Sequence, residues 1–175
     1  VSKTYATKLM SEMPEIIGIK ELTLTRSNAC ALNDSGAPFC WGSDSRLDVP
    51  AEIAEFRFSQ LKSTNAGTCG FGGSDLACWG DFYGVRFDME VFDGLSSDVV
   101  DLAVNGSGVC LLDAEGAKCL RVGDQEWREI AFEKALLISL SSPGWGSSAC
   151  VLDSYEGLNC YSAWEQDAYP DDVNV

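Results

Sequence analysis

Eight cysteines fall into four pairs, and their spacing is the feature that most constrains the fold of this chain. The first cysteines of successive pairs are 39, 41 and 40 residues apart, and the second cysteines are 38, 41 and 41 residues apart. Within the pairs the separations are 10, 9, 9 and 10 residues. A repeat of about this length is typical of propellers and solenoids. The pairs are Cys30 and Cys40, Cys69 and Cys78, Cys110 and Cys119, and Cys150 and Cys160.

The residues around the cysteines repeat as well. The run Ala29–Leu32 (ACAL) recurs as VCLL and ACVL in the third and fourth repeats, and Phe39–Gly42 (FCWG) recurs as ACWG in the second. An alternating apolar segment precedes the first cysteine, which predicts a strand there. Its apolar residues are Leu22 and Leu24, then Val100, Leu102 and Val104, then Leu136, Ile138 and Leu140. A polar loop and a tight hairpin follow, so each repeat is predicted to be a unit of short strands.

The hairpin predicts how each pair of cysteines meets. In the first repeat the turn Asn33–Gly36 (NDSG) ends in Gly36, which can supply the positive φ of a three-residue loop. This register places Leu32 opposite Pro38 and Cys30 opposite Cys40. Gly116 has the same role in the third repeat, in a loop that is one residue shorter.

Cysteines that face each other across an antiparallel pair have the separation that a disulfide requires. Zinc is the first alternative, but zinc-binding pairs usually lie two to four residues apart. Free buried thiols of a reducing compartment are the second. An even number of cysteines in matched local pairs favours four disulfides and an extracellular, cell-surface or periplasmic location.

The chain resembles the regulator-of-chromosome-condensation repeat family at Cys30-Ala31-Leu32, Gly36, Cys40-Trp41-Gly42 and Pro50. The resemblance runs from about Pro14 to Val175, and the paired cysteines are similar to a secreted or surface bacterial subtype that includes propeller-type β-lactamase inhibitors. It implies an all-β fold of propeller-type blades of about 40 residues, each with a proline-started strand after the hairpin. We expect a lead-in at 1–13 and repeats at about 14–49, 50–89, 90–129 and 130–175.

Family members usually close a ring of seven four-stranded blades, whereas this chain has four repeats. An open arc exposes strand edges, which natural proteins avoid. We therefore expect a homo-oligomer or a fragment of a longer propeller chain, with a small closed ring and an open arc as the alternatives.

Charge and composition exclude several functions. The chain has 12 basic and 27 acidic residues, a net charge of −15, and no histidine. An acidic surface repels nucleic-acid phosphates and anionic lipid, and no stretch is long and apolar enough to cross a bilayer. The Ser-His-Asp and Cys-His sites are impossible, no pair of acids stands out, and we expect neither enzymatic activity nor a cofactor or metal.

The function expected is that of a secreted or surface-displayed binding module, adhesin-like, with a protein or glycan as ligand. The alternative is a secreted inhibitor of an enzyme. Trp41 and Trp79 repeat after the second cysteine and are interpreted as structural packing between blades. The candidate binding residues lie in loops and in the segments between blades, where recognition residues collect. They are Trp145 in a loop of the fourth repeat, Phe82, Tyr83 and Arg86 after the second hairpin, and Trp127 in the third repeat. The alternative is that they cover their own blade; Trp127 has Trp164 as its counterpart in the fourth repeat, and both would then lie in an outer strand.

Overall fold

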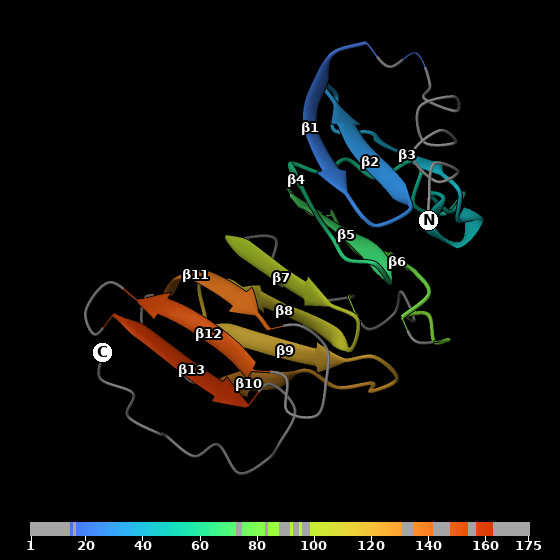
Figure 1. The fold of residues 1–175 in the computed structure, drawn as a ribbon. Coiled ribbons are helices and arrows are strands. Elements are labelled where there is room, and N and C mark those ends of the chain that lie inside the picture. Colours follow the sequence, from blue (N-terminus) through green and yellow to red (C-terminus); the bar gives the residue numbers. More distant parts are fainter. Residues whose placement is uncertain are drawn as a thin grey trace. The chain divides into compact units, whose positions relative to one another are not determined.

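The structure, a computed structural model, describes residues 15, 17–72, 75–82, 84–87, 92, 95, 99–130, 135–141, 148–153 and 157–162. These residues form short antiparallel strands and a single turn of 3-10 helix (Figure 1). The first half of the chain contains β1 (Ile19–Leu24), β2 (Asn28–Asn33), β3 (Pro38–Gly42), η1 (Ser45–Leu47), β4 (Gln60–Ser63), β5 (Gly67–Gly72) and β6 (Asp75–Gly80). The second half contains β7 (Asp101–Asn105), β8 (Gly108–Leu112), β9 (Ala117–Arg121), β10 (Arg128–Ile130), β11 (Ala135–Leu140), β12 (Ser148–Asp153) and β13 (Leu158–Ser162).

The strands form four antiparallel sheets in which neighbours in sequence are neighbours in space. We call them blade 1 (β1–β3), blade 2 (β4–β6), blade 3 (β7–β10) and blade 4 (β11–β13). The fold is therefore all-β with propeller-type blades, as the repeat predicts. The chain divides into two compact units, residues 1–97 with blades 1 and 2 and residues 98–175 with blades 3 and 4.

A disulfide joins the second and third strands of every blade, and the predicted pairing is confirmed at all four sites. Cys30 lies opposite Cys40 and Leu32 opposite Pro38, which is the register that the turn predicts. The Cα atoms of the bonded cysteines are 4.0–4.1 Å apart, close to the spacing of a non-hydrogen-bonded antiparallel pair. Gly36 has a φ of 81°, a conformation that favours a residue without a Cβ. Its N–H donates to the Asn33 carbonyl and closes the turn.

The expectation of a strand beginning at Pro50 is wrong. The N–H groups of Ile53 and Ala54 both donate to the Pro50 carbonyl, so the chain coils into a turn instead of extending. The coil brings Ile53 into the core between blades 1 and 2, where it is 1% exposed. Only blade 3 has a fourth strand within the described residues, because β10 pairs with β9 there.

A core lies between the two blades of each unit. In the first unit, Cys30 and Leu32 of blade 1 pack with Phe58, Leu61 and Trp79 of the segment that forms blade 2. Phe58 stacks on Trp79 with ring centroids 6.0 Å apart. The equivalent core of the second unit contains Cys110, Leu112, Ala117 and Cys119 of blade 3 and Ile138, Ala149 and Val151 of blade 4.

The second blade departs from the repeated ACAL pattern for a packing reason. Gly70 stands where the other repeats have Ala31, Leu111 and Val151. A Cβ at this position would lie 2.7 Å from the ring of Phe58. The ring of Phe58 thus occupies the space that the missing side chain would need.

Among the described residues, no helix is long and apolar enough to cross a membrane. The same part of the chain contains no cluster of three or more histidine, cysteine or acidic side chains placed to hold a metal ion.

Candidate binding pocket of the first unit

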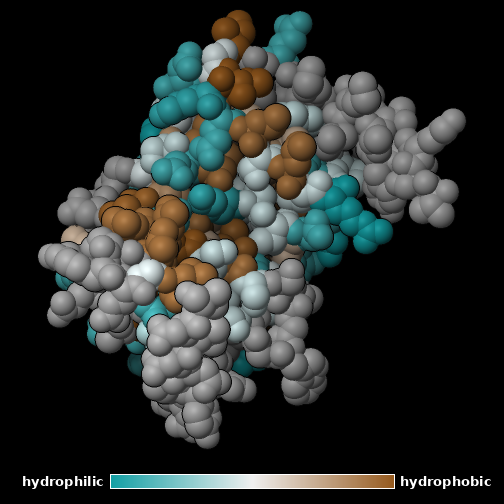
Figure 2. All heavy atoms as spheres, turned by 60° about the vertical axis from the view of Figure 1, so that its left-hand side comes forward, coloured by the Kyte–Doolittle hydropathy of each residue, from teal (hydrophilic) through white to brown (hydrophobic). Residues whose placement is uncertain are grey.

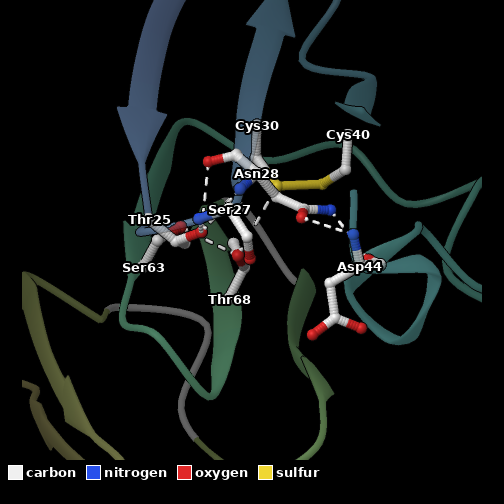
Figure 3. Close-up of a disulfide and its surroundings, with 8 residues drawn as sticks. All are labelled: Thr25, Ser27, Asn28, Cys30, Cys40, Asp44, Ser63 and Thr68. Carbon is white, nitrogen blue, oxygen red and sulfur yellow. Dashed lines mark hydrogen bonds between the residues drawn. A yellow bond between two sulfur atoms is a disulfide. The ribbon is translucent and has the colours of Figure 1, made fainter. Parts of the chain in front are cut away.

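A partly buried polar network fixes the segment that follows β3 (Figure 3). The amide side chain of Asn28 donates to the backbone carbonyl of Asp44 at 2.8 Å and accepts from its N–H at 3.0 Å. Thr25 Oγ1 accepts from the N–H groups of Ser27 and Asn28, which closes the turn before β2. Asn28 is fully buried, so both of its hydrogen bonds are needed to offset its desolvation.

Asp44 in turn holds η1 and Arg46. Its carboxylate accepts from the Arg46 N–H at the start of the helical turn. It also accepts from Nε and Nη2 of the Arg46 guanidinium, at 2.9 and 2.7 Å. The remaining guanidinium nitrogen, Nη1, donates to Asp81 of the loop after β6. Arg46 therefore joins the end of blade 1 to the end of blade 2.

The ion pairs shift the pKa values of both partners. The hydrogen bonds from Arg46 hold the pKa of Asp44 below its usual value, against a smaller opposing effect of burial. The two carboxylates raise the pKa of Arg46. The Arg46 side chain is 60% exposed, so the pair positions the loop more than it stabilises the fold.

A tight turn after β6 carries Arg86. Phe82 and Val85 exchange backbone hydrogen bonds, and Gly84 between them has a φ of 84°. The N–H of Gly84 donates to Asp81, so the carboxylate that binds Arg46 also closes this turn. Beyond the turn, Phe87 packs edge-on against Phe82 with ring centroids 4.9 Å apart.

These elements enclose a pocket of about 240 Å³ within the first unit. One side consists of η1 and the Pro50 turn, and the other consists of the end of β6 and the segment with Arg86. Its lining includes Arg46, Val49, Pro50, Ile53, Cys78, Trp79, Arg86 and Phe87, with Asp48 and Glu52 as acidic members. The pocket thus combines aromatic rings with guanidinium groups, the composition of binding hot spots.

Two lining residues have polar groups that make no hydrogen bond with the described residues. The guanidinium of Arg86 is exposed and makes no hydrogen bond or ion pair with the described residues. Trp79 is 3% exposed, and its buried indole N–H finds no acceptor in the described part of the chain. A buried donor without a partner costs free energy, so an acceptor that reached it would be favoured.

The sequence-based candidates are not assembled into one site. Arg86 lines the pocket, and Phe82 lies in the same turn but is 1% exposed. Phe82 fills the space over Gly67, where a Cβ would lie 2.4 Å from its ring, so we assign it to packing. Trp127 is half-buried directly before β10 in the second unit. Tyr83 and Trp145 lie outside the described residues.

Arg46 and Phe87 are not among the site residues predicted from the sequence. Arg46 follows an Asp by two residues, a spacing that favours an N-cap and an ion pair within one helical turn. Its second partner, Asp81, belongs to the next repeat, and only tertiary structure brings it within reach. Phe87 had no signal beyond its place in an aromatic loop.

No family model matches the chain, and no curated protein matches it. Solved structures of β-propellers do match. The ectodomain of the receptor kinase CR4 from Physcomitrella patens has 16% identity and a TM-score of 0.62, over 88% of this chain and 44% of that one. The CRINKLY WD40 ectodomain of the receptor kinase ACR4 from Arabidopsis thaliana has 15% identity and a TM-score of 0.57, over 87% and 54%.

A third structural match is Prp20p from Saccharomyces cerevisiae, whose described binding properties concern Gsp1p and histones. It has 16% identity and a TM-score of 0.57, over 82% of this chain and 44% of that one. The chain spans 44–54% of the length of these three proteins. At this identity the likeness establishes the β-propeller fold.

Proposed function

We propose that this chain is a non-enzymatic, extracellular protein-binding module of the cysteine-paired regulator-of-chromosome-condensation type. The pocket of the first unit is the observation that carries the proposal, because it places a guanidinium with no partner among the described residues beside aromatic walls. Four disulfides favour an oxidising compartment. The ectodomains among the structural neighbours support the extracellular placement.

The size and lining of the pocket favour one apolar side chain of a protein partner over an extended ligand. A volume of about 240 Å³ is below the usual range of small-molecule pockets, about 300–1,000 Å³. A carbonyl or carboxylate beside that side chain would accept from Arg86. The net charge of −15 favours a partner that is basic overall, since opposite charge accelerates encounter.

The role proposed for such a module is adhesin-like recognition at a cell surface, with Trp145 and Tyr83 as additional contact residues. Loops on a rigid scaffold are where recognition residues collect, which supports this assignment. A secreted inhibitor of an enzyme would use the same surface in another way.

The experiment is a cell-surface pull-down with the immobilised chain, accompanied by a glycan array, followed by affinity measurements on the captured partner. Arg86→Ala is expected to weaken binding by about 1–2 kcal/mol, or roughly 5- to 30-fold. Arg121→Ala is the control, because Arg121 is exposed, lies outside the pocket and changes the net charge equally. Equal effects of the two variants would refute the pocket as the binding site. A captured enzyme that loses activity at a 1:1 ratio would identify the inhibitor role instead, and binding to glycans alone would exclude a protein ligand.

A further inference from the structure

Neighbouring blades within a unit pack through two distinct faces. The face that carries the disulfide, here called the donor face, belongs to the earlier blade: Cys30 and Leu32 of blade 1, and Cys110 and Leu112 of blade 3. It packs against the opposite face of the later blade, here called the receiving face. The receiving face centres on the first strand, at Leu61 of blade 2 and Ile138 of blade 4, which are 3% and 6% exposed.

Each contact between a donor face and a receiving face is here called a joint. In both joints an acidic residue on the first strand of the earlier blade adds a hydrogen bond to the later blade. Glu21 of β1 accepts a hydrogen bond from the backbone N–H of Leu61, at 3.1 Å. Asp101 of β7 accepts one from the N–H of Ile138, also at 3.1 Å. Glu21 and Asp101 both stand nine residues before the first cysteine of their repeat. The two joints are therefore built in the same way.

Blade 4 has an open donor face. Leu152 is the repeat equivalent of Leu112 and Leu158 that of Ala117, because each stands two residues from its disulfide cysteine. In blade 3 these positions are 1% exposed, whereas Leu152 is 37% and Leu158 is 62% exposed. The pairing register places Leu137, which is 55% exposed, beside Leu152 and Leu152 beside Leu158. The three leucines thus form a continuous ladder across the sheet, on a side of blade 4 where Figure 2 shows apolar residues gathered.

Blade 1 has an open receiving face. Leu22 is the equivalent of Leu61 and Ile138, since it pairs with Ala31 as Ile138 pairs with Val151. It is 53% exposed, and Leu24, which pairs with Ala29 as Leu140 pairs with Ala149, is 62% exposed. The blade 1 residues that are equivalent to the buried residues of the internal joints are therefore exposed.

We infer that two copies of this chain associate head to tail, with the donor face of blade 4 in one copy packed on the receiving face of blade 1 in the other. The occupant of each face is identified by the joints inside the chain, where a donor face covers a receiving face twice. Such a contact is heterologous, because the two copies contribute different surfaces.

The chemistry of the open faces suits contact between identical acidic chains. Leu137 pairs with Leu152 as Glu21 pairs with Leu32 and Asp101 pairs with Leu112, so it stands where the two internal joints have a carboxylate. The intermolecular joint therefore replaces a carboxylate by an apolar side chain. This substitution avoids burying another negative charge between two copies that each carry −15.

The test uses one variant for each face, Leu158→Asp for the donor face and Leu22→Asp for the receiving face. Both leucines are more than half exposed, so the isolated chain is expected to fold with an unchanged melting temperature. The measurement is sedimentation equilibrium of the whole chain, which has a mass of 18.9 kDa. The wild type is expected to form species of two or more chains, and each variant alone to raise the dissociation constant at least about 10-fold.

The decisive sample is an equimolar mixture of the two variants. Each variant retains the face that the other has lost, so the mixture is expected to form a complex of two chains and nothing larger. Val85→Asp is the control, because Val85 is 42% exposed in a loop outside both faces and should leave wild-type association unchanged. A wild type that stays monomeric at high concentration, or a mixture that stays monomeric, would overturn the proposal.

Discussion

Replacing Trp41 and Trp79 tests whether equivalent positions of the repeat contribute equally to the free energy of unfolding. The sequence assigns Trp41 and Trp79 the same packing role, but the structure distinguishes them. Trp79 is 3% exposed and stacks on Phe58 inside the core of the first unit, whereas Trp41 is half-buried. Trp79→Ala leaves a large cavity there, which is expected to cost about 3–5 kcal/mol of unfolding free energy. Trp41→Ala removes less buried surface, and we expect a cost of about 1–2 kcal/mol.

A third variant, Trp79→Phe, separates ring packing from the indole N–H. The N–H finds no acceptor among the described residues, and a buried donor without a partner costs about 1–3 kcal/mol. Phenylalanine fills less of the space but removes this penalty. The two effects oppose each other, so the net loss is expected to stay below about 1.5 kcal/mol.

The assay is urea unfolding followed by circular dichroism, under non-reducing conditions that keep the disulfides intact. Hydrogen exchange of β5 and β6 amides reports the first unit separately from the second. The reasoning fails if Trp41→Ala destabilises the chain as much as Trp79→Ala. A loss above about 1.5 kcal/mol for Trp79→Phe would show that removing the unpartnered N–H gives no compensating gain.

Three further predictions concern bonds within the units. Thiol titration of the denatured, unreduced chain should detect no free sulfhydryl, and four or more reactive thiols would contradict the disulfide assignment. Asp101→Ala should lower the free energy of unfolding by about 1–3 kcal/mol and expose the Ile138 amide to hydrogen exchange, because Asp101 is 8% exposed and binds that amide. Glu21→Ala should cost less, because Glu21 is half-buried. A larger cost for Glu21→Ala than for Asp101→Ala would refute this comparison. The lowered pKa of Asp44 means that its contribution to stability is complete well above pH 3.8, the ordinary pKa of the group, and is lost as pH falls through the lower folded value. Acid titration of stability should therefore be flatter for Asp44→Asn, and an unchanged titration would count against the Arg46 ion pair.

The blades themselves were predictable because their determinants are local. The turn Asn33–Gly36 sets the hairpin register, and the register brings Cys30 opposite Cys40. Both effects act within about ten residues of chain, so a single repeat contains all the information they need. The same reasoning extends to the other three hairpins, whose cysteines have nearly the same spacing.

The segments between blades were predicted less well. Pro50 suits either the start of a strand or the start of a turn, since its ring fixes φ and removes an N–H in both. The turn forms here because it buries Ile53 in the core between blades 1 and 2, which stabilises the folded chain. That gain is absent from the local sequence, and a pattern of residues cannot show it.

The sequence by itself determined the all-β repeat, the four disulfides and the acidic surface, all of which follow from spacing, turn chemistry and composition. Only the tertiary structure decided that Phe82 packs inward, that Arg46 reaches Asp81 of the next repeat, and that Arg86 lines a pocket with Trp79. It also decided that Leu22 and Leu158 are exposed, although their repeat equivalents Leu61 and Ala117 are buried. The physical reason is that burial depends on which blade lies against a face, and equivalent residues in a repeat have different neighbours.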